Sequence, residues 1–475
     1  MRNKKLRIML LCVILISVFT TGCYNPEAKQ TLSAYNGLIE WGGKDGKTDY
    51  SRGVAHYNEK MYEQSIAELT KAIELEPKNI EAYHYRGRAY GALKMHEQAI
   101  SNFDQAIGLN PEYAWSYNHR GNTYLTMAMY DQAFSDYSTA IELNAKLLAA
   151  YHQRKSFYQS SGMKDQFNAD SNKVNELQFQ LAELYCNRGN GYDLAKMYEQ
   201  AIFDYSKAIE LNPNDVNAYQ KRGRIYYTAE FYEQAGADFS KAIELDPTFV
   251  SLYRDRGDLY ERQEKYDQAI ADYNRAIELD SAFSATYYKR GNLYRAKKMY
   301  NQALADYSKV IELDPTFADA YYNRGNLYAA MRRYDQAIAD YNKTVSLDSS
   351  FVNAYYNRGT VYEREEMYDQ AIASYSRAID LDPSRGNAYY NRGNVYVIYK
   401  MYDHAIDDYS SALELDDSLA NAYYNRGNVY DSKGMHAKAA ADFGKAMEID
   451  SRNGRSYSNR GVYDIRQRPS MTLAK

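Results

Sequence analysis

An Arg-Gly pair that returns every 34 residues constrains the fold of this chain more than any other feature. A fixed period of this length is the signature of stacked supersecondary units. Only Arg154-Lys155 breaks the pair, and it keeps the phase. A single compact core stops growing at about 250–300 residues, so a chain of 475 residues fits an open-ended array. The pair stands at Arg52-Gly53, Arg86-Gly87, Arg120-Gly121, Arg188-Gly189 and onward to Arg460-Gly461.

Each unit carries the pattern of two amphipathic helices. In residues 318–351, Ala320, Tyr321, Gly325 and Tyr328 share one face at helical spacing, and Ala337, Tyr341 and Val345 do so in a second segment. The fold class is therefore all-α, a solenoid of about twelve 34-residue helix-turn-helix repeats. Asp-Pro and Asn-Pro pairs are expected to form the turns into the next unit, at Pro111, Pro213, Pro247, Pro315 and Pro383.

Glycine inside a helix costs about 1 kcal/mol relative to alanine, so its regular return needs a packing reason. We expect close helix contact, in which small residues face the glycines and tyrosines fill the wider gaps beside them. The small residues are Ala99, Ala133, Ala201, Ala235 and onward to Ala439, and the tyrosines are Tyr137, Tyr205, Tyr273 and Tyr307.

The order Tyr321, Gly325, Tyr328, Ala337, Tyr341, preceded by Asp314-Pro315, resembles the tetratricopeptide repeat. The pattern recurs in register across 46–453, with a last half-unit at 454–468. This resemblance implies a right-handed superhelix in which the first helix of each pair lines a concave groove, the usual ligand surface of the family.

Arginine precedes every glycine, where the family usually has leucine, which places a charge on the packed face. Such a charge needs a partner. Ten of twelve units offer an acid at the matching place in the second helix, including Asp136, Asp204, Asp238, Asp272, Asp306, Asp340, Asp408 and Asp442. We predict a structural ladder of ion pairs.

One unit, 148–181, breaks the rules. Lys155 takes the glycine place and Phe167 the small-residue place, so normal close packing should fail. Leu177 to Leu181 replaces the usual turn residues. We expect a long helix through the turn, or a bend, separating three repeats at 46–147 from eight at 182–453; the alternative is ordinary drift in one continuous array.

The first residues resemble a bacterial lipoprotein signal. A basic start to Arg7, an apolar run from Ile8 to Phe19 and the sequence Thr20-Thr21-Gly22-Cys23 fit this reading. The run is too short for a permanent membrane span. The resemblance implies cleavage after residue 22, lipidation of Cys23 and export to the cell envelope, with a tether at 23–45. Tyr24 after the cysteine implies the outer membrane in a double-membraned bacterium, and 454–475 is expected to form a capping helix and tail.

Function is expected to be binding. Residues four apart on the first helix share a face, so Tyr322 and Asn326 should project into the groove. The asparagines just before four of the arginines, Asn323, Asn357, Asn391 and Asn425, also resemble the asparagine ladder of the O-linked N-acetylglucosamine transferase. Asparagine can pair with both N–H and C=O of an extended peptide. The alternative is that these residues only stabilise the stack. The candidate peptide-binding residues are Tyr288, Asn292, Tyr322, Asn323, Asn326, Tyr356, Asn357, Tyr390, Asn391, Asn394, Tyr424, Asn425 and Asn428.

Other classes of function have less support. The chain has 58 basic and 62 acidic residues, so its charge provides no positive electrostatic field that would attract nucleic acid. His84, His119 and His152 are expected to lie about 10 Å or more apart, too far to share a metal. We predict no enzyme activity, no cofactor and no metal. The expected partners are proteins or extended peptides, with cell-wall glycan as the alternative because tyrosine faces can stack on sugars.

Overall fold

The computed structural model describes residues 46–452, which form 22 helices, α3 to α24, and no strand. The all-α prediction is therefore confirmed for this part of the chain. The predictions for residues 1–45, including Cys23, and for 454–475 lie outside the described residues. None of the described helices is both long and apolar enough to cross a membrane.

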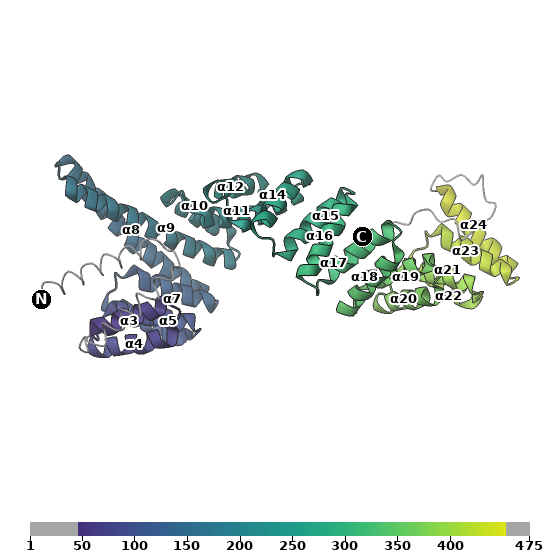
Figure 1. The fold of residues 1–475 in the computed structure, drawn as a ribbon, viewed down its shortest axis with the longest axis horizontal. Helices are drawn as coiled ribbons and strands as arrows, with labels where there is room; N and C mark the ends of the chain where they lie inside the picture. The colour runs from purple at the N-terminus through teal and green to yellow at the C-terminus, as the bar shows by residue number, and fades with distance from the viewer. Residues whose placement is uncertain (1–45, 453–475) are drawn as a thin grey trace. The chain divides into compact units, whose positions relative to one another are not determined.

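The chain divides into two compact units, one ending at Leu245 and one beginning at Asp246. The first unit contains α3 (Gly46–Asn58), α4 (Tyr62–Leu75), α5 (Ile80–Ala92), α6 (His96–Leu109), α7 (Ala114–Thr126), α8 (Tyr130–Ser160), α9 (Lys164–Leu194), α10 (Tyr198–Leu211), α11 (Val216–Thr228) and α12 (Tyr232–Leu245). The second contains α13 (Val250–Arg262), α14 (Tyr266–Leu279), α15 (Ser284–Ala296), α16 (Tyr300–Leu313), α17 (Ala318–Ala330), α18 (Tyr334–Leu347), α19 (Val352–Arg364), α20 (Tyr368–Leu381), α21 (Gly386–Ile398), α22 (Tyr402–Leu415), α23 (Ala420–Ser432) and α24 (His436–Arg452) (Figure 1).

Short turns join the two helices of each repeat. In the turn before α22, Lys400 adopts a left-handed conformation with φ of 56°, and the Met401 N–H donates to the Tyr396 carbonyl over 2.9 Å. This left-handed end with a bond back across the last turn satisfies carbonyls that the helix leaves free. The Asp and Asn turns between repeats also form as expected: Asp314 caps its own turn by accepting from the Thr316 N–H at 2.9 Å.

The repeated glycines face aromatic rings, except Gly53, which faces Leu69, and not the small residues that the sequence suggested. A Cβ built on Gly325 would lie 3.0 Å from Cε1 of Tyr341, and the same substitution at Gly257 would meet Tyr273 at 2.6 Å. The prediction that the tyrosines sit beside this contact was wrong. The ring of the second helix lies directly on the glycine, because a missing Cβ leaves a flat surface wide enough for it.

The repeat 148–181 is not stacked between its neighbours. Helix α8 continues through the expected turn at 144–147, and α9 continues through Leu177–Leu181, so both helices reach 31 residues. The long helix through the second turn was expected, but the one through the first was not. The two helices run side by side and extend past the rest of the first unit as a hairpin that turns at Gly162 (Figure 1).

The repeats on either side of this hairpin touch each other directly. Asn187 of α9 donates to Asn118 of α7 over 3.1 Å, and Arg188 donates to Ser138 of α8 over 3.2 Å. Elsewhere the same positions join consecutive repeats, as in the bond from Arg222 to Ser206. The stack therefore continues from residues 114–143 to 182–215 with the intervening repeat extruded. This corrects the prediction that the unit at 148–181 separates the repeats at 46–147 from those at 182–453.

Candidate ligand-binding face

The arginines before the glycines hold the repeats together. Arg324 Nε and Nη2 donate to the two carboxylate oxygens of Asp340, both at 2.8 Å, and Nη1 donates to Ser308 of the preceding repeat at 3.1 Å. The predicted ladder is confirmed. The acid partners are Glu68, Asp136, Asp170, Asp204, Asp238, Asp272, Asp306, Asp340, Asp408 and Asp442.

Two repeats use neutral partners in place of the acid. Arg86 donates to Asn102 at 2.7 Å and Arg358 donates to Ser374 at 3.1 Å. Where the partner is an acid, its burial is costly: burial raises the pKa of Asp340, and the bond from Arg324 offsets this only in part. The arginines act as structural ties between helices and do not project freely into solvent.

The tyrosines and asparagines predicted to bind a ligand form a second network between repeats. The hydroxyl of Tyr341 donates to Asn326 at 2.8 Å within its own repeat. Asn357 of the next repeat donates to Asn326 at 2.9 Å and to the Tyr322 hydroxyl at 3.1 Å. Equivalent bonds run from Asn323 to Tyr288, from Asn391 to Tyr356 and from Asn425 to both Tyr390 and Asn394.

Most of these side chains are inside the stack, which corrects the expected groove-facing placement. Their hydrogen-bonding groups point to neighbouring repeats, and the Oδ1 atoms of Asn357 and Asn391 are themselves buried. We call this network the floor, because it lies beneath the exposed side of the same helices. Its contacts are those expected if these residues only stabilise the stack. Tyr322, Asn323, Asn326, Tyr356, Asn357, Asn391 and Asn394 are buried, Tyr288, Asn292, Tyr390, Tyr424 and Asn425 are half-buried, and Asn428 in α23 is exposed.

The exposed edge of the same face comes from residues that the sequence analysis did not single out. Asn387 and Asn421 are exposed three residues before Tyr390 and Tyr424, so they share that helix face. Asn353 holds the same place in α19, where it accepts from Arg385 at 2.6 Å. Ile398 lies at the other end of the face in α21 and is 37% exposed. The sequence signal that could have identified this edge is the 34-residue spacing of Asn353, Asn387 and Asn421.

The histidines are closer together than expected. The ring centroids of His84 and His119 lie 5.0 Å apart. These two residues occupy the same repeat positions as Tyr322 and Asn357, whose side chains are hydrogen-bonded to each other in later repeats. Burial lowers the pKa of His84, and burial together with Arg88 lowers the pKa of His119 to about 3. Both rings are therefore neutral at physiological pH.

The structure brings no metal-binding constellation together in residues 46–452. No group of three or more His, Cys, Asp or Glu side chains there could hold a metal ion. Gly189 and Gly191 lie inside α9 and form no phosphate-binding loop. The thiol of Cys186 is half-buried beside Asp215, and burial raises its pKa.

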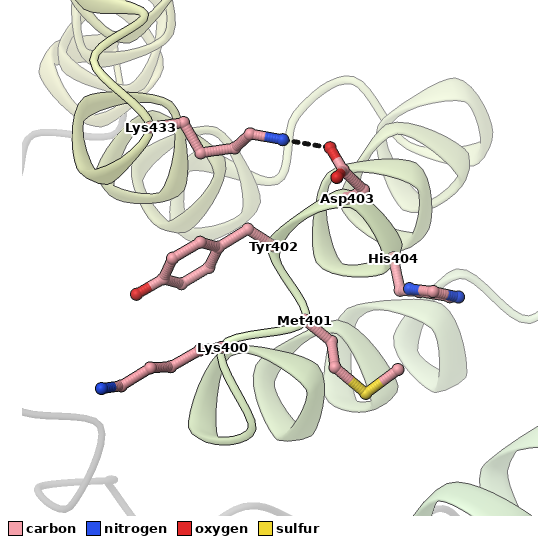
Figure 2. Close-up of a pocket in the computed structure, with 6 residues that line it drawn as sticks. All are labelled: Lys400, Met401, Tyr402, Asp403, His404 and Lys433. Atoms are coloured by element: carbon pink, nitrogen blue, oxygen red, sulfur yellow. Dashed lines mark hydrogen bonds and ion pairs between the residues drawn. The ribbon is translucent and has the colours of Figure 1, made fainter.

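A hollow of about 490 Å³ lies at the turn between α21 and α22. Figure 2 shows Lys400 and Tyr402 extending to one side of it and Met401 and His404 to the other, while Lys433 pairs with Asp403. The same pair recurs as Lys297 with Asp267 between two earlier repeats. The hollow is thus one joint between consecutive repeats.

These features define the molecule as a repeat protein built from stacked antiparallel helix pairs. Models of the tetratricopeptide repeat match most of the described chain and leave 148–181 unmatched, in agreement with the extruded repeat. The chain belongs to the tetratricopeptide repeat family. The matched residues are 50–79, 68–101, 116–147, 182–215, 216–249, 239–271, 257–297, 291–331, 318–351, 352–385, 386–419 and 420–453.

Solved structures of repeat proteins resemble parts of the chain. MamA is 29% identical, with 34% of this chain and 96% of MamA covered and a TM-score of 0.34. YrrB, described as a TPR protein with an unusual peptide-binding site, is 29% identical over 38% of this chain and 92% of its own, with a TM-score of 0.36. The C-terminal part of a repeat protein from Cytophaga hutchinsonii is 19% identical over 52% and 98%, with a TM-score of 0.45. No curated protein matches significantly.

Proposed function

We propose that this chain is an interaction scaffold that binds extended segments of other proteins along the face of α19, α21 and α23. The observation that carries the proposal is the row of asparagines at Asn353, Asn387 and Asn421, one in each of three consecutive repeats. Their amides lie at the edge of a floor in which the side-chain N–H groups of Asn391 and Asn425 already donate to tyrosine hydroxyls of the preceding repeat.

The chemistry of this edge suits backbone recognition. An asparagine amide both donates and accepts, so it can pair with the N–H and C=O groups of an extended chain. The three asparagines themselves carry no charge, and Arg385 beside Asn353 adds one positive charge to the edge. The hydrogen bonds between repeats beneath this edge hold the amides at a fixed spacing, which lowers the entropy lost on binding. Recognition that tolerates many side chains follows.

Asn387→Ala combined with Asn421→Ala should weaken capture of extended peptides by about 5- to 150-fold. Two net hydrogen bonds are worth about 1–3 kcal/mol together. Fluorescence anisotropy with peptides selected from a library measures the change. The matched control is Gln336→Ala with Gln370→Ala, which removes exposed amides at the same spacing from the second helices α18 and α20. Equal loss in both variants would show that this face is not the binding surface.

We also propose that Cys23 carries a lipid that anchors the chain in the cell envelope and makes envelope proteins its partners. The anatomy of residues 1–23 supports this. In the native host, labelled fatty acid should be incorporated into the wild-type chain, and Cys23→Ser should abolish the label and move the protein from the membrane fraction to the soluble one. A Cys186→Ser variant serves as the control. Label that persists in Cys23→Ser would refute the anchor.

A further inference from the structure

The joint between the repeats at 80–113 and 114–147 contains a pair of histidines. His84 of α5 is 3% exposed, and its ring centroid lies 5.0 Å from that of His119 in α7. The hydroxyl of Ser116, also in α7, lies 3.2 Å from Nδ1 of His84. The two imidazole rings therefore meet directly across the joint.

Aromatic side chains enclose this pair. The rings of Tyr113 and Phe103 lie 5.3 and 5.8 Å from that of His84. Phe103 also stacks on His119 at 6.2 Å, and Trp115 stacks on it at 6.1 Å. Surroundings of this kind favour the neutral form of an imidazole, because a charged ring would lose its hydration.

The charged groups around the pair do not offset a proton on either ring. Burial lowers the pKa of both histidines, and the positive charge of Arg88 in α5 lowers it further. Across residues 46–452, neither imidazole forms an ion pair with an acid. The acids on the packed helices act on other groups: Glu74 of α4 on Arg86, Glu81 on Tyr113, Glu183 of α9 on Arg88, and Asp104 of α6 and Asp136 of α8 on Arg120. A phenol does not ionise at acidic or neutral pH, and the tyrosines around the joint are Tyr50, Tyr57, Tyr85 and Tyr113.

The same two repeat positions hold a different pair in the second unit. There a tyrosine stands at the place of His84, and an asparagine of the next repeat stands at the place of His119 and donates to the tyrosine hydroxyl. The pairs are Tyr288 with Asn323, Tyr322 with Asn357, Tyr356 with Asn391 and Tyr390 with Asn425, joined over 2.9 to 3.1 Å. Neither side chain of such a pair takes up a proton between about pH 4 and 8. The histidine joint differs in carrying two groups that can.

We propose that this joint is acid-sensitive: it holds the repeats at 80–113 and 114–147 together at neutral pH and opens when His84 and His119 take up protons. One protonated ring places a cation near Arg88 in apolar surroundings, and a second places two imidazolium rings in contact. Neither cost exists in the unfolded chain. This inference is independent of the proposed peptide binding.

The direction of the pH dependence follows from the folded and unfolded states. A histidine in the unfolded chain has a pKa of about 6.5, whereas the pKa of His119 in the folded joint is lowered to about 3. The unfolded chain therefore binds more protons between these values. The stability of the joint is complete above about pH 6.5 and is lost as the pH falls from there towards about 3.

Hydrogen exchange on the chain from residue 23 with Cys23→Ser, at about pH 7.5 and about pH 5.0, tests the proposal. After correction for the intrinsic exchange rate, protection of the α5 and α7 amides should fall by about 30-fold or more at the lower pH, the change expected for one histidine that stays neutral in the folded state. The α17 and α19 amides are the internal control, because Tyr322 and Asn357 join these helices. They should lose clearly less protection. Equal losses in the two places would overturn the proposal.

A pair of substitutions assigns the response to the histidines. His84→Tyr combined with His119→Asn installs the pair that Tyr322 and Asn357 form in the second unit, so the extra acid response of α5 and α7 should disappear. The matched control is His152→Asn, which removes an exposed histidine of α8 outside the joint and should retain the wild-type response.

Circular dichroism verifies that both variants fold. If the double variant does not fold, the comparison of α5 and α7 with α17 and α19 in the wild-type chain still decides. An acid response that persists in a folded double variant, or one that His152→Asn removes, would contradict the proposal.

Discussion

Replacing Arg324 with methionine should destabilise the repeat at 318–351 by about 3–5 kcal/mol. Asp340 is only 5% exposed and receives both of its charged bonds from this arginine. Breaking a buried pair from one side leaves a charge without a partner, which is the costly outcome. Hydrogen exchange of the α17 and α18 amides, together with urea unfolding, measures the loss in this repeat and in its neighbours.

The chain supplies its own control for this prediction. Arg358 makes the same kind of tie but to the neutral Ser374, so Arg358→Met should cost clearly less than Arg324→Met. The double variant Arg324→Met with Asp340→Leu should recover most of the stability, because an apolar pair can replace a buried ion pair at little cost. If Arg358→Met costs as much as Arg324→Met, the ties do not act through the buried acid.

Gly257→Ala should destabilise the second unit by about 1–3 kcal/mol, although alanine is the better helix former. The new Cβ would lie 2.6 Å from Cε1 of Tyr273, whose ring is fully buried and cannot move aside. Helix propensity alone would favour alanine by about 1 kcal/mol, so the sign of the change decides between packing and propensity. Thermal and urea unfolding provide the measurement.

Gly444→Ala is the matched control for the glycine contact. Gly444 lies within α24, is exposed, and a Cβ there would meet nothing within 4 Å. The substitution should therefore stabilise the chain by up to about 1 kcal/mol. Were Gly257→Ala also stabilising, the close approach between Gly257 and Tyr273 would not be a packing constraint.

The sequence was sufficient for the features that depend on one repeat at a time. The period, the paired helices, the Asp-Pro turns and the arginine–acid ties could all be predicted, because Arg324 and Asp340 belong to the same unit. Whether the side chains of Tyr322 and Asn326 are exposed or buried could not be predicted in this way. Helical spacing shows that two residues share a face, but not that Asn357 of the next repeat covers them.

The extruded repeat shows a similar limit. Lys155 and Phe167 indicated that close packing would fail, and Leu177 to Leu181 indicated one missing turn. The first missing turn left a weaker signal, in that Ala145 stands where other repeats often have proline. The loss of both turns leaves this unit outside the stack. The contacts of Asn187 with Asn118 and of Arg188 with Ser138, which the sequence does not show, reveal that the stack closes behind it.

The central claim, that the face of α19, α21 and α23 binds extended protein segments, is tested most directly by competition between ligand classes. The purified chain is offered a peptide library and cell-wall fragments in parallel, with photoreactive groups placed at residues 387 and 421 in turn. The account predicts capture of peptides that cross-link at both positions. Capture of glycan without peptide, or of peptides that cross-link at neither position, would contradict it.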